Sequence, residues 1–246
     1  MKIIIAGATG FVATEVVRQA LSIPTITSIV ALARRETPVP QGIDPKADLT
    51  KLKSVVCDDF ANYSQNVKEE LSGADACIWL LAITPTKSKT MAWDEVRKIC
   101  LDYTVHGLSV TSQLARDSTS PFRFMYVSGS ASERDQSKKP MFLGDYLLMR
   151  GQVETKVLDF AKDSGGAMEA CVAKPGMIDG PGRQGLIQRA VINAGHSLIR
   201  FPKVDVKEVA ATLLDQAMNG FEKETLENED LIRIGQKVLS AQEKSS

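Results

Sequence analysis

Short apolar runs alternate with longer amphipathic stretches along the chain. The runs are almost continuously hydrophobic, which is typical of strands that are covered on both faces. They lie at Lys2–Ala6, Ser28–Ala33, Ser54–Cys57, Ala76–Leu81, Phe122–Ser128 and Met168–Lys174, and a further strand is predicted at Leu231–Ile234. This alternation predicts an α/β fold, with a doubly wound, mostly parallel sheet of about seven strands and helices on both faces.

The stretches between the strands have helical periodicity. Phe11–Leu21 carries one apolar stripe at helical spacing. Further helices are predicted at Trp93–Arg116, bent near Gly107, at Tyr146–Lys162, and at Val206–Asn219, which Gly220 closes. We expect a single domain over residues 1–246, with a small C-terminal substrate lobe and substrate-side elements from 130–145 and 177–205.

Composition narrows the possible partners. The 246 residues are 43% hydrophobic and 24% charged, and 30 basic residues balance 30 acidic ones. Zero net charge argues against a nucleic-acid footprint, and no apolar run approaches the ~20 residues that a membrane helix needs. The four cysteines lack metal-ligand spacing, so we expect reduced core thiols and no metal. These features predict a cytoplasmic protein without nucleic-acid or membrane partners.

A glycine-rich turn joins the first strand to the first helix. It reads Gly7-Ala8-Thr9-Gly10-Phe11-Val12-Ala13. Gly7 permits the tight turn, Gly10 lets the backbone approach a diphosphate, and small Ala13 allows the helix to pack closely. The helix amino terminus then offers N–H groups and a positive dipole end to the phosphates. A strand before this turn and a helix after it predict a nicotinamide dinucleotide site.

The end of the second strand bears on cofactor choice. An acidic residue there would indicate NAD, whereas this chain has Ala33-Arg34-Arg35. Guanidinium groups match a 2′-phosphate, and Thr9 could add a hydroxyl donor, so NADP(H) is favoured over NAD(H). Glu36 and the possibility of two solvated arginines weigh against this. Asp58 and Asp59 could face the adenine amino group, or Asp59 could cap the next helix.

Three further segments carry a family resemblance. Ser128 ends a predicted strand, Tyr146-Leu-Leu-Met-Arg150 begins a predicted helix, and Lys174-Pro175-Gly176-Met177 follows the sixth strand. Over roughly residues 1–220 the chain resembles the atypical or extended short-chain dehydrogenase/reductase superfamily, particularly small Tat-interacting-protein-type oxidoreductases. The resemblance implies a Rossmann fold and a catalytic set of Ser128, Tyr146 and Arg150. It also implies cofactor contacts from Leu81, Ala82, Tyr146, Arg150, Pro175, Gly176, Met177 and Ile178.

Position 150 departs from the family pattern, which has lysine there. Tyr146 and Arg150 are one helical turn apart, so a cation can favour the phenolate. An arginine does not release its proton at accessible pH, which blocks a relay through that side chain. Two functions follow: an NADP(H)-dependent reductase or dehydrogenase with a modified Ser-Tyr-Arg set, or an NADP(H)-binding protein without hydride transfer, such as a sensor, regulatory partner, isomerase or cyclase.

The substrate is predicted from the surroundings of this set. The apolar residues in the segments expected around it favour a small, hydrophobic carbonyl compound. These residues are Met141, Phe142, Met149, Met177 and Ile178. Only about seventy residues follow Lys174, which disfavours the larger lobe of a nucleotide-sugar epimerase. Helices 93–116 and 146–162 could pair in a homodimer, but a monomer is equally compatible with the sequence.

Overall fold

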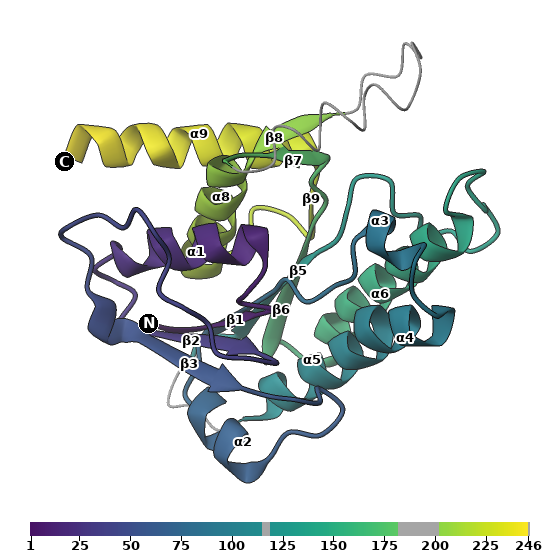
Figure 1. Ribbon diagram of the computed structural model, residues 1–246, viewed down its shortest axis with the longest axis horizontal. Helices are drawn as coiled ribbons and strands as arrows, with labels where there is room; N and C mark the ends of the chain where they lie inside the picture. Colours follow the sequence, from purple (N-terminus) through teal and green to yellow (C-terminus); the bar gives the residue numbers. More distant parts are fainter. Residues whose placement is uncertain (115–118, 182–201, 246) are drawn as a thin grey trace.

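The computed structural model describes residues 1–114, 119–181 and 202–245 (Figure 1). Its central sheet has seven parallel strands in the order β3-β2-β1-β4-β5-β6-β9. The strands are β1 (Lys2–Ala6), β2 (Ser28–Ala33), β3 (Leu52–Val56), β4 (Ala76–Trp79), β5 (Phe122–Val127), β6 (Met168–Ala173) and β9 (Thr225–Leu226). A separate parallel pair joins β7 (Met177–Asp179) to β8 (Lys203–Asp205).

Helices cover both faces of the sheet (Figure 1). One face packs against α1 (Phe11–Leu21), α8 (Val206–Asn219) and α9 (Asn228–Ser245). The other packs against α2 (Gln65–Leu71), α4 (Trp93–Arg97), α5 (Tyr103–Gln113) and α6 (Gly144–Asp163). A π-helical turn spans Lys98–Asp102, a 3-10 turn spans Leu49–Lys51, and the short α3 covers Pro85–Ser88.

Burial of both sheet faces explains the uninterrupted apolar runs. In β1, Ile3 and Ile5 belong to the core beside α1 and α8, whereas Ile4 and Ala6 belong to the core beside α5 and α6. Successive side chains of a strand point to opposite faces, so both sets must be hydrophobic. The doubly wound α/β prediction is confirmed, and the first six predicted strands match the observed ones to within two residues at each end.

The predicted seventh strand was wrong. Residues 231–234 lie in α9, and the last strand of the sheet is β9, which pairs with β6. Leu231 and Ile234 are 0% and 4% exposed, and both belong to the core beside α8. Their spacing of three residues, continued by Val238, is helical and places all three on one face. The short apolar run was therefore one stripe of an amphipathic helix.

The long helix predicted at 93–116 also differs. Helical structure runs from Trp93 to Gln113 and includes a π-helical segment at Lys98–Asp102, and a bend near Gly107 stays a prediction. Residues 115 and 116 lie outside the described part of the chain. Gly107 serves close packing, because a Cβ there would lie 2.1 Å from Cη2 of the buried Trp79.

The Gly107 contact yields a stability prediction. Gly107→Ala should destabilise the protein by about 1–3 kcal/mol, because the added methyl overpacks the Trp79 ring, despite alanine's better helix propensity. Chemical denaturation followed by circular dichroism measures the change. Gln113→Ala, an exposed change on the same helix, should stay within about 0.5 kcal/mol of wild type. Equal stability of the two variants would contradict the packing argument.

Candidate functional site

The sheet reverses its strand order between β1 and β4. The chain builds β1, β2 and β3 outward and then returns to the other side of β1 for β4. In such sheets a ligand crevice opens at the carboxyl ends of the two strands that flank the reversal. Gly7 follows β1, and Leu81 lies just beyond β4. The predicted cofactor turn therefore lies at the position where this topology places a ligand.

The turn has the close backbone approach that its glycines predict. Gly7 has a φ of +80°, and its N–H donates to the Leu32 carbonyl at 2.9 Å. A Cβ on Gly7 would lie 2.8 Å from the Leu81 backbone nitrogen. Gly10 precedes α1 as its N-cap without a side-chain cap, and Ala13 is 1% exposed. The close approach of the Leu81 backbone thus requires glycine at position 7, and the start of α1, which has no side-chain cap, suits a phosphate group.

The β7 segment closes on the same turn. A Cβ on Gly180 would lie 2.9 Å from Cζ of Phe11, the first residue of α1. Ile178 of β7 packs against the core on the α1 face. The structure thus brings Phe11 together with Gly180, and a cofactor groove at this place stays a prediction. The rest of the predicted substrate element, residues 182–201, lies outside the described residues.

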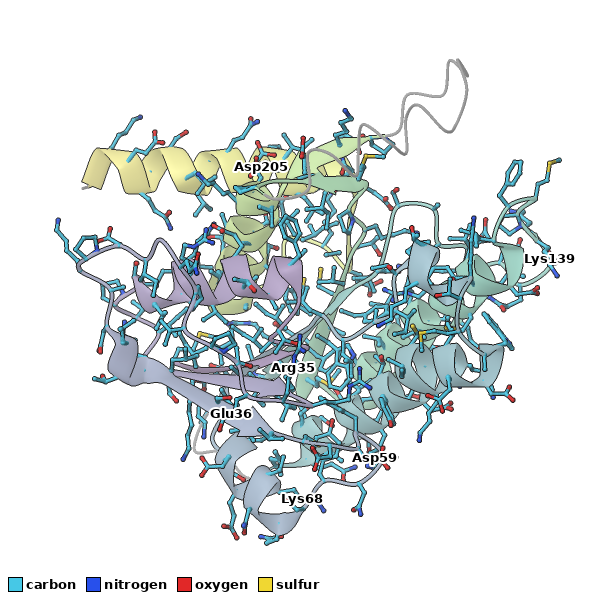
Figure 2. The ribbon with its side chains drawn as sticks, in the orientation of Figure 1. Arg35, Glu36, Asp59, Lys68, Lys139 and Asp205 are labelled. Atoms are coloured by element: carbon cyan, nitrogen blue, oxygen red, sulfur yellow. The ribbon has the colours of Figure 1, made fainter. Side chains whose placement is uncertain are left out.

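A cavity of about 540 Å³ lies between α1 and the loop after β2. Its lining includes Thr9 and Arg35, which follow β1 and β2, but not Arg34. The other lining residues are Ala8, Thr14, Val17, Arg18, Thr37, Pro38, Val39, Pro40 and Gln41. Arg35 and Glu36 are both exposed just after β2 (Figure 2). The geometry therefore separates the two predicted arginines and assigns the cavity to Arg35.

Arg18 is a second cation on this cavity that the sequence analysis missed. Its guanidinium pairs with Glu15, and its Nε donates to the Gln41 carbonyl at 3.1 Å. It therefore ties the loop after β2 to α1. Arg18 lies one helical turn after Thr14, in the helix that follows the glycine turn. This spacing could have indicated from the sequence that Arg18 faces the cavity.

Asp58 and Asp59 are both exposed after β3, and Figure 2 shows the position of Asp59. The Asp59 carboxylate accepts a hydrogen bond from the Ala61 N–H at 3.1 Å. Hydrogen bonds from the Tyr103 hydroxyl and the Ala61 backbone lower the pKa of Asp59. Ser64 caps the following helix, so the alternative that Asp59 caps it was wrong. An adenine contact by Asp58 or Asp59 stays a prediction.

Tyr146 lies in the first turn of α6 and is 7% exposed. Its hydroxyl donates to the Ile83 carbonyl, in the loop after β4, at 2.7 Å. Burial raises the pKa of Tyr146 above its ordinary value, and the Arg150 guanidinium offsets only part of this rise. The cation therefore acts in the predicted direction, but desolvation outweighs it in this environment.

Arg150 is 4% exposed beneath the end of β5. Its Nη2 donates to the Val127 carbonyl at 2.7 Å, and its guanidinium carbon lies 5.0 Å from the Tyr126 ring centroid. Burial lowers the pKa of Arg150, while the nearby Tyr126, Tyr146 and Cys100 raise it by more, so its pKa is above the ordinary value. No carboxylate in residues 1–114, 119–181 or 202–245 lies within ion-pairing distance of it. The guanidinium is thus a fixed buried cation next to Tyr146.

Ser128 lies at the end of β5. Its hydroxyl hydrogen-bonds to neither Tyr146 nor Arg150, but to two other side chains. Its Oγ is 2.5 Å from Oε1 of Glu154 and 3.0 Å from Oγ of Ser132. The predicted set therefore divides into a Tyr146–Arg150 pair and a separate Ser128–Glu154 pair. Glu154, Ser132 and their partners were missed, although Glu154 follows Arg150 by one helical turn, a spacing that places both on one face.

The Pro175-Gly176 turn lies beside Ser128. The Ser130 N–H donates to the Pro175 carbonyl at 2.9 Å, and Gly176 N–H donates to Oδ1 of Asn228 at 2.8 Å. A Cβ on Gly176 would lie 2.1 Å from the Pro202 carbonyl oxygen. The close approach requires glycine and connects the end of β6 to β8. The structure therefore places this turn beside the loop that follows Ser128, and its predicted contact with the nicotinamide stays a prediction.

The predicted apolar surroundings are only partly assembled. Met149 is 5% exposed and belongs to the core beneath α6, so its expected pocket role was wrong. Met141 and Phe142 are 90% and 80% exposed before α6. Met177 and Ile178 are half-buried in β7. All four cysteines are buried and unpaired, as expected for core thiols.

No protein-family model matches the chain. It is 29% identical over 146 residues to Protein FMP52, mitochondrial, of Candida albicans, a match that covers 54% of this chain. The chain spans 59% of that curated relative.

Several solved structures resemble most of the chain. One is the dTDP-glucose 4,6-dehydratase DesIV from Streptomyces venezuelae with NAD and TYD bound, at a TM-score of 0.69, 15% identity, and coverage of 98% of this chain and 81% of that chain. Another is the UDP-glucuronic acid 4-epimerase from Bacillus cereus in complex with UDP-glucuronic acid and NAD, at a TM-score of 0.64 and 15% identity, with coverage of 92% of this chain and 77% of that chain. A third is the PhqB reductase domain from Penicillium fellutanum, at a TM-score of 0.66 and 16% identity, with coverage of 93% of this chain and 67% of that chain.

These likenesses confirm the predicted resemblance at the level of the fold. The chain shares its Rossmann-like α/β architecture with a dehydratase, an epimerase and a reductase domain. Among the described residues, no helix combines the length and apolar character that crossing a bilayer requires. The cytoplasmic location stays a prediction.

The Gly7 geometry yields a binding prediction. Gly7→Ala should weaken NADPH binding at least about tenfold. Alanine is strained at the positive φ of this position, and its Cβ would in addition strike the Leu81 backbone and displace the turn. Gly42→Ala is the matched control, since Gly42 has a φ of +66° but no atom within 4 Å of the place where a Cβ would lie. Titration of intrinsic or NADPH fluorescence measures both affinities. Equal losses in the two variants would show that backbone strain, not the close approach, matters.

Proposed function

We propose that this chain is an NADP(H)-dependent oxidoreductase that acts on a small, hydrophobic carbonyl compound through Tyr146, Arg150 and Ser128. The observation that carries the proposal is the meeting of a glycine turn, a cation-lined cavity and a buried tyrosine–arginine pair at the carboxyl ends of one parallel sheet. Sheets of this topology bind ligands at that edge.

The cofactor contacts follow the strand order. Gly7, Gly10 and the start of α1 would hold the diphosphate, and Arg35 with Thr9 would hold a 2′-phosphate in the cavity. Leu81, Ala82 and the segment from Pro175 to Ile178 would enclose the nicotinamide. When bound, the reduced cofactor supplies a hydride to the carbonyl carbon.

The protein's own groups then set the polarity of the reaction. Tyr146 would be the proton donor, and burial, which raises the pKa of its phenol, keeps the hydroxyl protonated until negative charge develops on the substrate oxygen. Arg150 holds a fixed positive charge beside that hydroxyl and favours negative charge as it develops. The guanidinium donates no proton itself, so Tyr146 must be reprotonated from the cleft and not along the helix.

The arginines yield a prediction on cofactor choice. Arg35→Ser should weaken NADPH binding about 10- to 100-fold, because it removes a charge-assisted hydrogen bond to the 2′-phosphate, and should change NADH binding less than about twofold. Arg34→Ser is the matched control and should have the smaller effect, since only Arg35 lines the cavity. Parallel fluorescence titrations of wild type and the two variants with NADPH and NADH measure the six affinities. A wild-type preference for NADH, or no difference between the two variants, would contradict this assignment.

Tyr146 yields a prediction on turnover. Tyr146→Phe should lower turnover about 10²- to 10⁴-fold by removing the proton donor, and leave NADPH affinity within about twofold. NADPH oxidation followed by absorbance across a panel of small aldehydes and ketones measures the rate. Wild-type turnover that is insensitive to this substitution would exclude Tyr146 as the donor.

A second function, NADP(H) binding without hydride transfer, is favoured by one observation. The Tyr146 hydroxyl donates to the Ile83 carbonyl and the Ser128 hydroxyl contacts Glu154, so both predicted substrate donors bond to protein acceptors. This arrangement suits a sensor, regulatory partner, isomerase or cyclase. Tight NADPH binding with no oxidation across the carbonyl panel would favour this function over the first.

A further inference from the structure

Glu154 is a fully buried carboxylate that the proposed reaction does not use. It lies in α6 and is 0% exposed. Its Oε2 accepts from Nε of Arg134 at 2.7 Å and lies 3.4 Å from Nζ of Lys174. Its Oε1 is 2.5 Å from Oγ of Ser128. One oxygen therefore faces two cations, and the other faces the serine at the candidate active site.

The two cations fix the charge on this carboxylate. A carboxylate buried away from water is stable only when it is paired and hydrogen-bonded, and Arg134 and Lys174 satisfy both conditions. An ionised carboxylate has no proton and only accepts hydrogen bonds. The hydroxyl proton of Ser128 therefore lies on the line to Glu154, which accounts for the short 2.5 Å contact.

The direction of the hydrogen bond between Ser128 and Ser132 follows from the number of protons and lone pairs on a hydroxyl group. A serine carries one hydroxyl proton and two acceptor lone pairs. Because Ser128 uses its one proton in the hydrogen bond to Glu154, it cannot donate to Ser132 as well. In the 3.0 Å contact between the two hydroxyls, Ser132 must therefore be the donor. One lone pair of Ser128 is left, and Ser128 is partly exposed at the end of β5.

We propose that Glu154 is a positioning residue that makes Ser128 a hydrogen-bond acceptor, so that the site selects ligands that present a hydroxyl group to it. A carbonyl oxygen has no proton to offer and opposes a lone pair there, whereas an alcohol donates directly. This inference rests on the proposed function and refines it: of a carbonyl and alcohol pair, the alcohol is the partner that Ser128 holds.

The loop that carries Ser132 and Arg134 is held against α6, the helix that carries Glu154. The Lys174 ammonium donates to the Ser132 carbonyl at 2.9 Å, and Arg134 also donates to Oγ1 of Thr225 at 2.9 Å. A Cβ on Gly151 would lie 1.7 Å from the Glu133 carbonyl oxygen. The hydroxyl pair is therefore held from β6, β9 and α6 at once, which preserves its polarity when a ligand arrives.

Glu154→Gln should reverse this polarity. Arg134 and Lys174 require an acceptor at the former Oε2 position, so the amide oxygen faces them and the amide NH₂ faces Ser128. The NH₂ group then donates to Ser128, whose proton is released toward the cleft. The variant should therefore prefer a ligand that accepts a hydrogen bond.

Two measurements test the proposal, and the first needs neither ligand nor activity. Neutron diffraction from crystals of the full chain exchanged into D₂O should place the Ser128 deuteron between Ser128 Oγ and Glu154, and the Ser132 deuteron toward Ser128. A deuteron on the Glu154 carboxylate, or a Ser128 deuteron directed to Ser132 or to the cleft, would overturn the proposal. This result is independent of whether the chain binds NADPH.

The second measurement compares cyclohexanol with cyclohexanone by ligand-observed NMR titration of the full chain without added cofactor, so that neither probe is turned over. Wild type should bind the alcohol more tightly, and Glu154→Gln should shift the affinity ratio toward the ketone about tenfold. In a Ser128→Ala background the Glu154→Gln change should leave the ratio unaltered. An unchanged ratio in the single variant, or no binding of either probe by wild type, would overturn the ligand selection. NADPH binding, titrated separately, reports failure of the proposed function.

Discussion

The close approach of two backbones at the centre of the sheet constrains the rest of this structure. Gly7 leaves β1 with a positive φ, and no larger residue fits between it and the Leu81 backbone. That contact sets the start of α1 directly above the point where the strand order reverses. The amino terminus of the helix, the cavity beside Arg35 and the loop after β4 take their places from it. The topology and one glycine thus place together the segments that we propose hold the dinucleotide.

Two buried charges on α6 form a second level of organisation. Arg150 and Glu154 are one helical turn apart, and each supports a different hydroxyl. The guanidinium lies beside Tyr146 and bonds the end of β5, whereas the carboxylate bonds Ser128 and takes its own counterions from Arg134 and Lys174. Buried charges are costly unless they are satisfied, so both are held by several partners. Arg150 holds a permanent charge and, unlike a lysine at this position, supplies no proton.

The fold was largely predictable because continuous apolar runs have few alternatives in a sheet covered on both faces. The prediction failed where a run was too short to show its period: Leu231 and Ile234 belong to a helical stripe, and the two residues of β9 carry little signal. The close packing of Gly107 on Trp79 was missed, because a glycine in a helical pattern does not reveal which side chain approaches it. The cofactor turn was predictable because its residues are adjacent in the chain. The Glu154 network was not, since Ser128, Arg134 and Lys174 meet it only through tertiary packing.

Hydrogen exchange monitored by mass spectrometry tests the central claim most directly. On addition of saturating NADPH, the account predicts slower amide exchange in peptides that cover residues 7–14 and 33–41, with a smaller effect of NADH on the second segment. Unchanged exchange at residues 7–14 with NADPH, or protection confined to segments away from the carboxyl ends of β1 and β2, would contradict it.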